Sequence, residues 1–282
     1  MKVFVAGAGY VGLELARQLA ARGERVWAAR RHPPALEPGI TPWPCDLGDP
    51  ALVVPEGITH LAFTASPDSS DPSSYERTYV EALTRTLEAF DRAGSTLERI
   101  VLVSSTSVFA AEDDAIVDES SPVRSDGTAA HIVAGESIVR ARRGGVVLRL
   151  AGIYGPERTR MIRMVKDGTA RCASSRPIGN RIHRDDCAGA MVHLLSHPAP
   201  ADLYVGVDRA PVELAEVYRW IASQLGLPAP AESDEPDARG RESLARGGSA
   251  RKRCSSRRLI ESGFAFRYPT YREGYGALLA GT

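Results

Sequence analysis

The start of the chain constrains its fold most strongly, because a glycine-rich turn there separates a strand pattern from a helix pattern. The apolar run Lys2–Ala6 ends at Gly7, and Gly9 and Gly12 complete a Gly-x-Gly-x-x-Gly spacing. Apolar residues then recur at helical spacing, and residues 25–29 have the composition of a second strand. A helix that joins two strands over so short a stretch forms a parallel βαβ unit. We therefore expect a sheet that begins with parallel strands.

The three glycines have the spacing that a dinucleotide-binding turn requires. Gly7 permits the tight turn, Gly9 lets the backbone approach a pyrophosphate, and Gly12 lets the helix lie close to the strand. The amino terminus of the helix adds N–H donors and the positive end of the helix dipole. We predict a cofactor site that includes Gly7, Gly9, Tyr10, Val11 and Gly12. A turn with a purely structural role is the alternative.

The end of the second predicted strand bears on which dinucleotide is preferred. A site selective for NAD usually has an acidic residue there, which accepts a hydrogen bond from the ribose 2′-hydroxyl. This chain has Arg30 and Arg31 instead. Two guanidinium groups suit a 2′-phosphate, because they form charge-assisted bidentate hydrogen bonds. We expect NADP(H) as the cofactor. NAD is the alternative if both arginines are solvated surface residues.

Strand and helix patterns continue to alternate along the chain. The sequence predicts a strand over residues 60–64, and residues 99–103 and 145–150 are nearly continuous apolar runs, which is typical of strands covered on both faces. Asp71 and Pro72 predict the start of a long helix, because they provide an N-cap and a proline at the first helical position. The sequence further predicts helices over residues 128–142, 186–196 and 213–225, a strand over 203–207 and a long loop over 228–258.

After residue 150 the composition shifts towards glycine, arginine and proline, and the periodicity weakens. This change predicts a division of the chain into two domains. We expect an α/β fold with a Rossmann-type doubly wound parallel sheet over residues 1–150, to which residues 183–199 return. A smaller C-terminal α/β substrate domain then comprises residues 151–182 and 200–282.

Composition excludes several classes of protein. The formal net charge of +0 removes the global field that nucleic-acid-binding proteins usually carry. No apolar stretch approaches the roughly 20 residues that span a bilayer, and the amino terminus does not have the pattern of a signal peptide. The four cysteines are scattered without metal-type spacing, so we expect reduced thiols, a cytoplasmic location and no metal site.

Further motifs follow in an order that chance rarely produces. They occupy residues 45–49 (CDLGD), 63–66 (FTAS), 103–110 (VSSTSVFA), 149–156 (RLAGIYGP), 180–188 (NRIHRDDCA) and 267–275 (RYPTYREGY). In these segments the chain resembles the extended short-chain dehydrogenase/reductase superfamily, specifically its NAD-dependent epimerase/dehydratase family. The resemblance implies adenine contacts from Asp46 and Leu47 and a backbone passage beneath the cofactor at Thr64 and Ala65. Ser104 completes the predicted cofactor residues.

The resemblance also implies a catalytic centre, of which one part is missing. In the family a serine or threonine polarises the substrate oxygen, and this position falls on Ser105, with Thr106 beside it. A tyrosine and a lysine four residues later then supply acid/base chemistry, because a phenol is a poor base at neutral pH unless a cation favours the phenolate. Residues 120–145 contain neither residue type. Alignment on Glu136 places Thr128 and Ile132 at the two positions, so the chain resembles the branch that lacks this pair.

Two residues on family motifs are candidate replacements for the missing acid. Tyr154 and His183 both belong to segments that the family places near the nicotinamide, and a histidine titrates near neutrality without assistance. The alternative for His183 is a structural role in its loop. The alternative for Ser105 is a serine that caps local backbone. Asp185 and Asp186 fit the start of a helix better than a catalytic carboxylate pair.

These observations lead to a functional prediction with an alternative from a different class. We expect an epimerase/dehydratase-like oxidoreductase with atypical acid/base chemistry, in which hydride passes to or from a carbonyl or alcohol carbon near Ser105. The resemblance implies a small-molecule substrate, with nucleotide sugars as one class, bound in a cleft between the domains. A non-catalytic NADP(H)-binding sensor or scaffold is the alternative. A nucleotide-sugar dehydrogenase that uses Cys172 or Cys187 is less well supported, and monomer and homodimer both stay open.

Overall fold

The computed structural model describes residues 1–35, 37–111, 113–234 and 251–281. The chain divides into two compact units. The first comprises residues 1–108, 124–149 and 187–204, and the second comprises residues 109–123, 150–186 and 205–282. Our sequence-based division left residues 109–123 in the first domain. They group with the second unit because β6 (Ile116–Val117) pairs in parallel with β15 (Arg253–Cys254).

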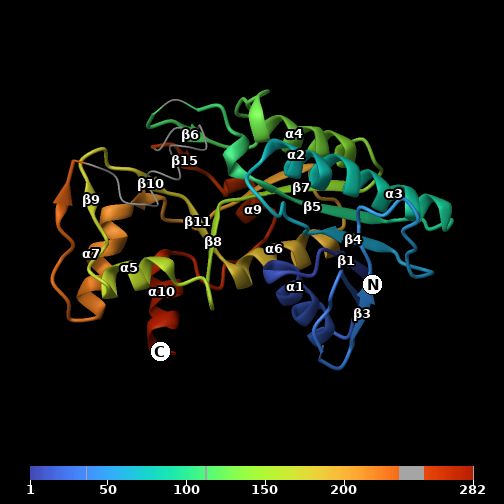
Figure 1. Ribbon diagram of the computed structural model, residues 1–282, viewed down its shortest axis with the longest axis horizontal. Coiled ribbons are helices and arrows are strands. Elements are labelled where there is room, and N and C mark those ends of the chain that lie inside the picture. Colours follow the sequence, from blue (N-terminus) through green and yellow to red (C-terminus); the bar gives the residue numbers. More distant parts are fainter. Residues whose placement is uncertain (36, 112, 235–250, 282) are drawn as a thin grey trace. The chain divides into compact units, whose positions relative to one another are not determined.

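A seven-stranded sheet forms the centre of the first unit (Figure 1). Its order is β12-β7-β5-β4-β1-β2-β3, and strands β1 to β5 pair in parallel with their neighbours. The bounds are β1 Lys2–Ala6, β2 Arg25–Arg30, β3 Ile40–Pro44, β4 His60–Phe63, β5 Arg99–Ser105, β7 Gly145–Leu150 and β12 Leu203–Gly206. The chain moves outward from β1 to β3 and then returns to β4 on the other side of β1. This reversal confirms the predicted doubly wound α/β class.

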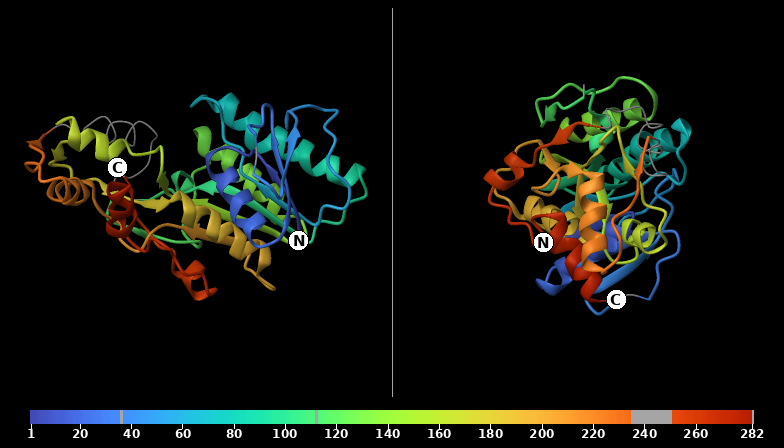
Figure 2. Two further views of the ribbon diagram at one scale, coloured as in Figure 1. Left: turned by 90° about the horizontal axis from the view of Figure 1, so that it is seen from below. Right: turned by 90° about the vertical axis from the view of Figure 1, so that its left-hand side faces the viewer.

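Helices cover both faces of this sheet. One face carries α2 (Pro72–Glu76), α3 (Leu83–Arg92) and α4 (Gly127–Arg140) (Figure 1). The other carries α1 (Tyr10–Ala21) and α6 (Arg184–Ser196), which lie side by side in Figures 1 and 2. The central strands β1, β4, β5 and β7 are therefore shielded on both sides, which accounts for their apolar runs, whereas the edge strand β3 is largely exposed.

The predicted long helix after Asp71 is present but not uniform. It begins at Pro72, and a π-helical segment, η1 (Arg77–Ala82), separates α2 from α3. Helix α4 packs closely on this segment. A Cβ atom on Gly135 would lie only 2.5 Å from the carbonyl oxygen of Tyr79. Glycine is therefore required where the two helices meet.

The second unit combines short strands with helices. Strands β8 (Gly152–Tyr154) and β11 (Arg181–His183) pair in parallel, as do β9 (Cys172–Ala173) and β14 (Glu232–Ser233), whereas β10 (Ile178–Gly179) and β13 (Val212–Glu213) are antiparallel. The helices are α5 (Arg160–Lys166), α7 (Leu214–Gln224), α9 (Arg257–Glu261) and α10 (Tyr271–Ala280). Much of the loop predicted over 228–258 lies outside the described residues.

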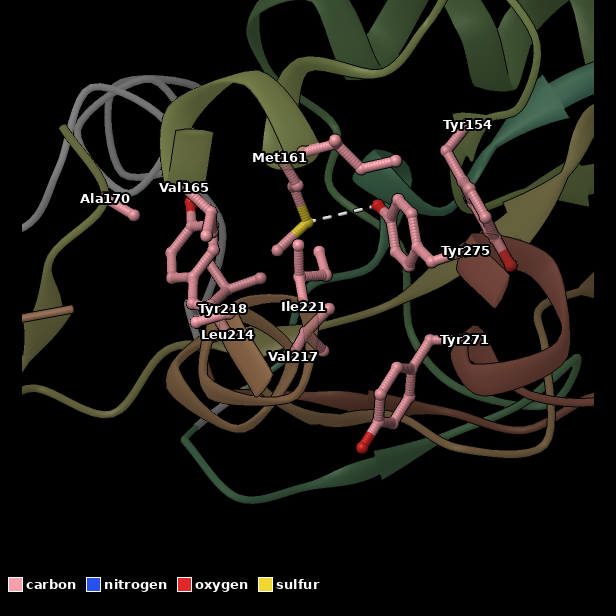
Figure 3. Close-up of a cluster of buried hydrophobic side chains, with 12 residues drawn as sticks. Tyr154, Met161, Val165, Ala170, Leu214, Val217, Tyr218, Ile221, Tyr271 and Tyr275 are labelled. Atoms are coloured by element: carbon pink, nitrogen blue, oxygen red, sulfur yellow. Dashed lines mark hydrogen bonds between the residues drawn. The ribbon is translucent and has the colours of Figure 1, made fainter. Parts of the chain in front are cut away.

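Helices α5, α7 and α10 supply the apolar core of the second unit (Figure 3). Met161 and Val165 of α5 pack with Val217 and Ile221 of α7, and Tyr275 of α10 completes this contact through its hydroxyl, 3.1 Å from the Met161 Sδ. A capping box between Thr270 and Glu273 begins α10. Of the described helices, none is long and apolar enough to cross a bilayer.

Candidate functional site

The glycine-rich turn follows β1 and approaches the end of β4 closely. Gly7 has φ +90°, and a Cβ there would collide with the backbone of Ala65. A Cβ on Gly12 would lie 2.6 Å from the Thr64 Oγ1, which itself donates a hydrogen bond of 2.8 Å to the carbonyl of Gly7. Glycine is therefore required at both positions, and Thr64 and Ala65 hold the turn in place.

The amino terminus of α1 has no side chain that satisfies it. Its N-cap is Gly9, no side-chain capping bond is formed, and the first turn contains no acidic residue. The N–H groups and positive dipole at this end are therefore directed to a site that an anion can occupy. Tyr10 and Val11 are half-buried in this first turn. Gly9 and its neighbours are therefore the candidate cradle for a pyrophosphate.

The two predicted ribose-reading arginines lie in different electrostatic surroundings. The carbonyl of Ala29 accepts hydrogen bonds from Gly7 and Ala8 at 3.0 and 2.8 Å, so β2 ends directly beside the glycine-rich turn. Arg30 is the exposed last residue of β2, and among the described residues it makes no ion pair. Arg31, in contrast, places its Nη2 3.2 Å from both carboxylate oxygens of Asp68. Arg30 is the better candidate for contact with a phosphate.

The predicted adenine contacts lie in the loop after β3. The Asp46 Oδ1 accepts a 2.8 Å hydrogen bond from the backbone N–H of Gly48, and Leu47 is half-buried. Arg85 of α3 donates a hydrogen bond to the Gly48 carbonyl and lies 3.4 Å from Glu81. Loop and helix are thereby joined, which fixes the position of Asp46 and Leu47.

The end of β5 carries the predicted hydroxyl cluster. The Ser105 Oγ accepts a hydrogen bond of 3.1 Å from the backbone N–H of Ser107, so the local capping role is present. Its hydroxyl proton is still able to donate. Thr106 is nearly buried in the short 3-10 helix η2 (Thr106–Val108). Ser105 is half-buried, so it is the more accessible donor of the two.

A buried ion pair lies behind this cluster. The Ser104 Oγ donates to the Glu136 Oε1 at 2.5 Å, and Arg149 donates to both oxygens of Glu136, at 2.8 and 2.6 Å. Our sequence reasoning used Glu136 only as an alignment marker and did not identify this network. The signal was available, because an arginine within the apolar run of residues 145–150 needs a buried partner.

At the two family positions, helix α4 carries neither a tyrosine nor a lysine. Ile132 is buried and Thr128 is half-buried, so the face that the family equips with a phenol and an ammonium group is without either. Tyr79 of η1 packs against this helix. Burial is the largest cause that raises the pKa of Tyr79 far above its ordinary value, and the charges of Tyr75 and Glu136 raise it further. Its phenol is therefore protonated at neutral pH.

The structure brings Tyr154 and His183 together inside the second unit. They are partners in the register of β8 and β11, and their ring centroids are 5.3 Å apart. Tyr154 stacks on Tyr275 at 4.5 Å, and its hydroxyl abuts Gly274. Burial is the largest cause that raises the pKa of Tyr154 well above its ordinary value. The charge of Arg181 lowers this pKa, but burial outweighs it, so the phenol is protonated at neutral pH.

His183 is equally enclosed. Its Nδ1 accepts a 3.2 Å hydrogen bond from the backbone N–H of Asp185, and burial is the largest cause that lowers its pKa to about 4. The imidazole is therefore neutral at physiological pH. Asp186 accepts hydrogen bonds from the backbone of Arg267 and Tyr268 at 2.6 and 3.0 Å. The second acidic residue thus anchors the chain before α10.

Metal and thiol chemistry each require a particular arrangement of side chains. No group of three or more metal-type side chains occurs in the parts of the chain that the structure describes. Cys172 and Cys187 are buried thiols, which weighs against a catalytic cysteine. Burial, with the nearby charge of Asp46, raises the pKa of Cys45 to about 11. That thiol is protonated at neutral pH.

Comparisons with known proteins show the family and the fold of the chain. Protein YeeZ of Escherichia coli (strain K12) is 26% identical, over 95% of this chain and 96% of YeeZ. A Methylobacillus flagellatus protein provisionally assigned as an NAD-dependent epimerase/dehydratase is 33% identical, with a TM-score of 0.80 over 99% of this chain and 98% of its own. Human epimerase family protein SDR39U1, solved with NADPH, has a TM-score of 0.79 at 21% identity over 100% of both chains, which shows the fold. The model of the NAD dependent epimerase/dehydratase family matches residues 3–206, and the chain belongs to this family.

Proposed function

We propose that the chain binds NADP(H) at the glycine-rich turn and acts as an oxidoreductase on a carbonyl or alcohol substrate. The position of Arg30 carries the proposal. It directly follows Ala29, whose carbonyl anchors the turn, and no described carboxylate neutralises it. In this proposal the uncapped start of α1 binds the pyrophosphate, and Arg30 binds the 2′-phosphate. NADPH in the structure of human SDR39U1 is consistent with it.

The other predicted contacts complete the proposed cofactor site. Asp46 and Leu47 bind the adenine end, the backbone of Thr64 and Ala65 passes beneath the dinucleotide, and Ser104 lies at the end of β5. When bound, the cofactor supplies or accepts a hydride at its nicotinamide. Arg31 has a secondary role, because Asp68 already offsets much of its charge. NAD is the alternative cofactor if the arginines do not discriminate.

Ser105 is the proposed donor of a hydrogen bond to the substrate oxygen, with Thr106 as its neighbour in the site. A positioned hydroxyl stabilises negative charge that develops on that oxygen during hydride transfer. We assign no proton transfer to Tyr154 or His183, because both are buried and neutral at physiological pH. The substrate proton then comes from a hydroxyl or from solvent. We propose small polar substrates, with nucleotide sugars as one class, and family membership is consistent with this proposal.

Titration with NADPH and with NADH tests the cofactor part of the proposal. We expect NADPH to bind more tightly, and Arg30→Ala to reduce its affinity about 10- to 100-fold, because a charge-assisted hydrogen bond is lost. NADH affinity should barely change. Arg31→Ala is the matched control and should have a smaller effect. Equal affinity of the native protein for both dinucleotides would remove the role of Arg30, and binding of neither would remove the site.

A non-catalytic NADP(H) sensor or scaffold is the second candidate function. The occupation of α4 by Thr128 and Ile132 favours it, because neither can act as the family's acid/base pair. Single-turnover assays with NADPH and a panel of carbonyl compounds distinguish the two. Turnover that falls about 10²-fold in Ser105→Ala supports catalysis. Tight NADPH binding without turnover, unchanged in Ser105→Ala, supports the sensor.

A further inference from the structure

The second unit contains buried polar groups that the proposed reaction does not use. Arg181 is 0% exposed, Asp208 is 1% exposed and Tyr154 is 4% exposed. Four of their side-chain atoms have no hydrogen-bond partner among the described residues: the Nε and Nη2 of Arg181, the Oδ2 of Asp208 and the Oη of Tyr154. Because buried polar groups are normally hydrogen-bonded, this set requires an explanation.

Arg181 and Tyr154 converge on one face of α10. The Cζ of Arg181 lies 5.6 Å from the ring centroid of Tyr271, and the Tyr154 hydroxyl abuts Gly274. Positions 271 and 274 are three residues apart, so they are neighbours on the same face of the helix. Figure 3 shows Tyr154, Tyr271 and Tyr275 at one end of the core cluster. The guanidinium and the phenol are therefore covered by a single turn of α10.

Asp208 reaches the same place from the segment after β12. Its backbone N–H donates to the carbonyl of Arg181 at 2.7 Å, and its Oδ1 accepts from the backbone of Ala210 at 3.0 Å. Arg181 donates from its Nη1 to the carbonyl of Ala210 at 3.2 Å. The next residue, Arg209, donates its backbone N–H to Pro269 at 2.8 Å, just before α10. Asp208 is thereby fixed beside Arg181 and the start of α10.

The two opposite charges are neighbours but do not touch. Within the described chain, no nitrogen of Arg181 lies within 4.0 Å of a carboxylate oxygen of Asp208. Burial raises the pKa of Asp208 to about 7, and the charge of Arg181 opposes this increase. A buried guanidinium and a buried carboxylate at this separation still have unused hydrogen-bonding capacity on both sides.

The chemistry of the unpartnered atoms selects the ligand. Arg181 offers only donors and the ionised form of Asp208 offers only acceptors, so a bound anion would satisfy the first and repel the second. A bound cation would do the reverse. Water accepts from Arg181, donates to Asp208 and exchanges a hydrogen bond with Tyr154. Internal waters with two to four polar partners are regular parts of protein structure.

We propose that an internal hydration site lies beneath α10, in which ordered water bridges Arg181, Asp208 and the hydroxyl of Tyr154. The site links β8, β11 and the segment after β12 to α10. It gives Tyr154 a structural role that fits its enclosure. It also makes Arg181 and Asp208 a water-mediated ion pair.

A crystal structure of the native chain at high resolution tests the site directly. We expect ordered water within hydrogen-bonding distance of the Asp208 Oδ2 and of a nitrogen of Arg181. Direct contact between guanidinium and carboxylate would overturn the proposal. So would a site with no ordered density.

Removal of the Tyr154 hydroxyl provides a test in solution, in which the direction of the change in Tm decides the outcome. If water bonds the Tyr154 hydroxyl, Tyr154→Phe breaks a hydrogen bond and should lower Tm by about 2–4 °C. If the hydroxyl is unbonded, its removal relieves a buried unsatisfied donor, so an unchanged or raised Tm would overturn the bridge. Tyr275→Phe is the matched control on the stacked ring, because its hydroxyl contacts the Met161 Sδ instead. Unfolding monitored by circular dichroism measures both variants.

Discussion

Substitution of Glu136 by glutamine should be strongly destabilising, although it changes few atoms. Glu136 and Arg149 have side chains only 2% and 4% exposed, and their closest atoms are 2.6 Å apart. The amide retains the shape and an oxygen for Ser104 but leaves Arg149 buried without this carboxylate. Loss of one partner from a buried ion pair costs about 3–5 kcal/mol. That is a large part of the free energy of unfolding of a typical protein, which is roughly 5–15 kcal/mol.

A second ion pair on the same helix provides the control. The Arg140 Nη2 lies 2.6 Å from the Asp202 Oδ2, which is the same separation, but these side chains are 44% and 51% exposed. Asp202→Asn should therefore cost about 0–1 kcal/mol. Chemical denaturation of the two variants, with cofactor absent, measures the difference. Similar losses in both variants would refute the argument that burial, rather than distance, sets the energy of these pairs.

The double variant Glu136→Leu with Arg149→Met extends this test. Replacement of both charges by apolar groups of similar size is often neutral, so much of the lost stability should return. Two effects limit the recovery of stability: any cavity that the new side chains leave, and the loss of the hydrogen-bond acceptor for Ser104. A double variant less stable than Glu136→Gln would show that the network contributes more than the pairing of two charges.

Three further predictions follow from the two units. Gly12→Ala should weaken dinucleotide binding at least 10-fold by calorimetry, because its Cβ would lie 2.6 Å from the Thr64 Oγ1. Asp208 has its pKa raised to about 7 in the folded chain, so its contribution to stability is lost as pH rises from about 4 to 7. Asp208→Asn should therefore gain stability relative to the native chain over this range. Unfolding measured as a function of pH checks this, and a stability difference between the two proteins that does not change with pH would contradict it. His183, with its pKa lowered to about 4, should show no NMR titration between pH 5 and 8.

The elements that the sequence predicts well are those with dense local signals. The turn at Gly7 and the buried strands of the first unit are specified by composition over a few neighbouring residues. The π-helical segment η1 was not predicted, although the stripe of Tyr75, Tyr79, Leu83 and Leu87 advances by four residues at each step. Such spacing suits a wider helical turn as well as an α-helix, so local pattern alone does not separate the two.

The second unit was harder to predict for a physical reason. Its strands are two or three residues long and pair with distant segments, as β6 does with β15, so they leave no periodicity. The same applies to its polar interior. The sequence shows that Arg181 belongs to a family motif. Only the folded structure shows that Asp208 and one face of α10 lie next to it. Long-range pairing of this kind is invisible to a local window.

Tyr154 and His183 show how environment decides the chemistry of a residue. Position on a family motif made both candidates for proton transfer, and their types are suitable. Burial raises the pKa of the phenol and lowers that of the imidazole, so both are neutral in the range where an enzyme needs an acid that exchanges its proton. Family membership accounts for the fold, and in our proposal the chemistry rests on Ser105 and its neighbours. If Ser105→Ala has no effect on any turnover, the remaining function of this site is to sense a dinucleotide.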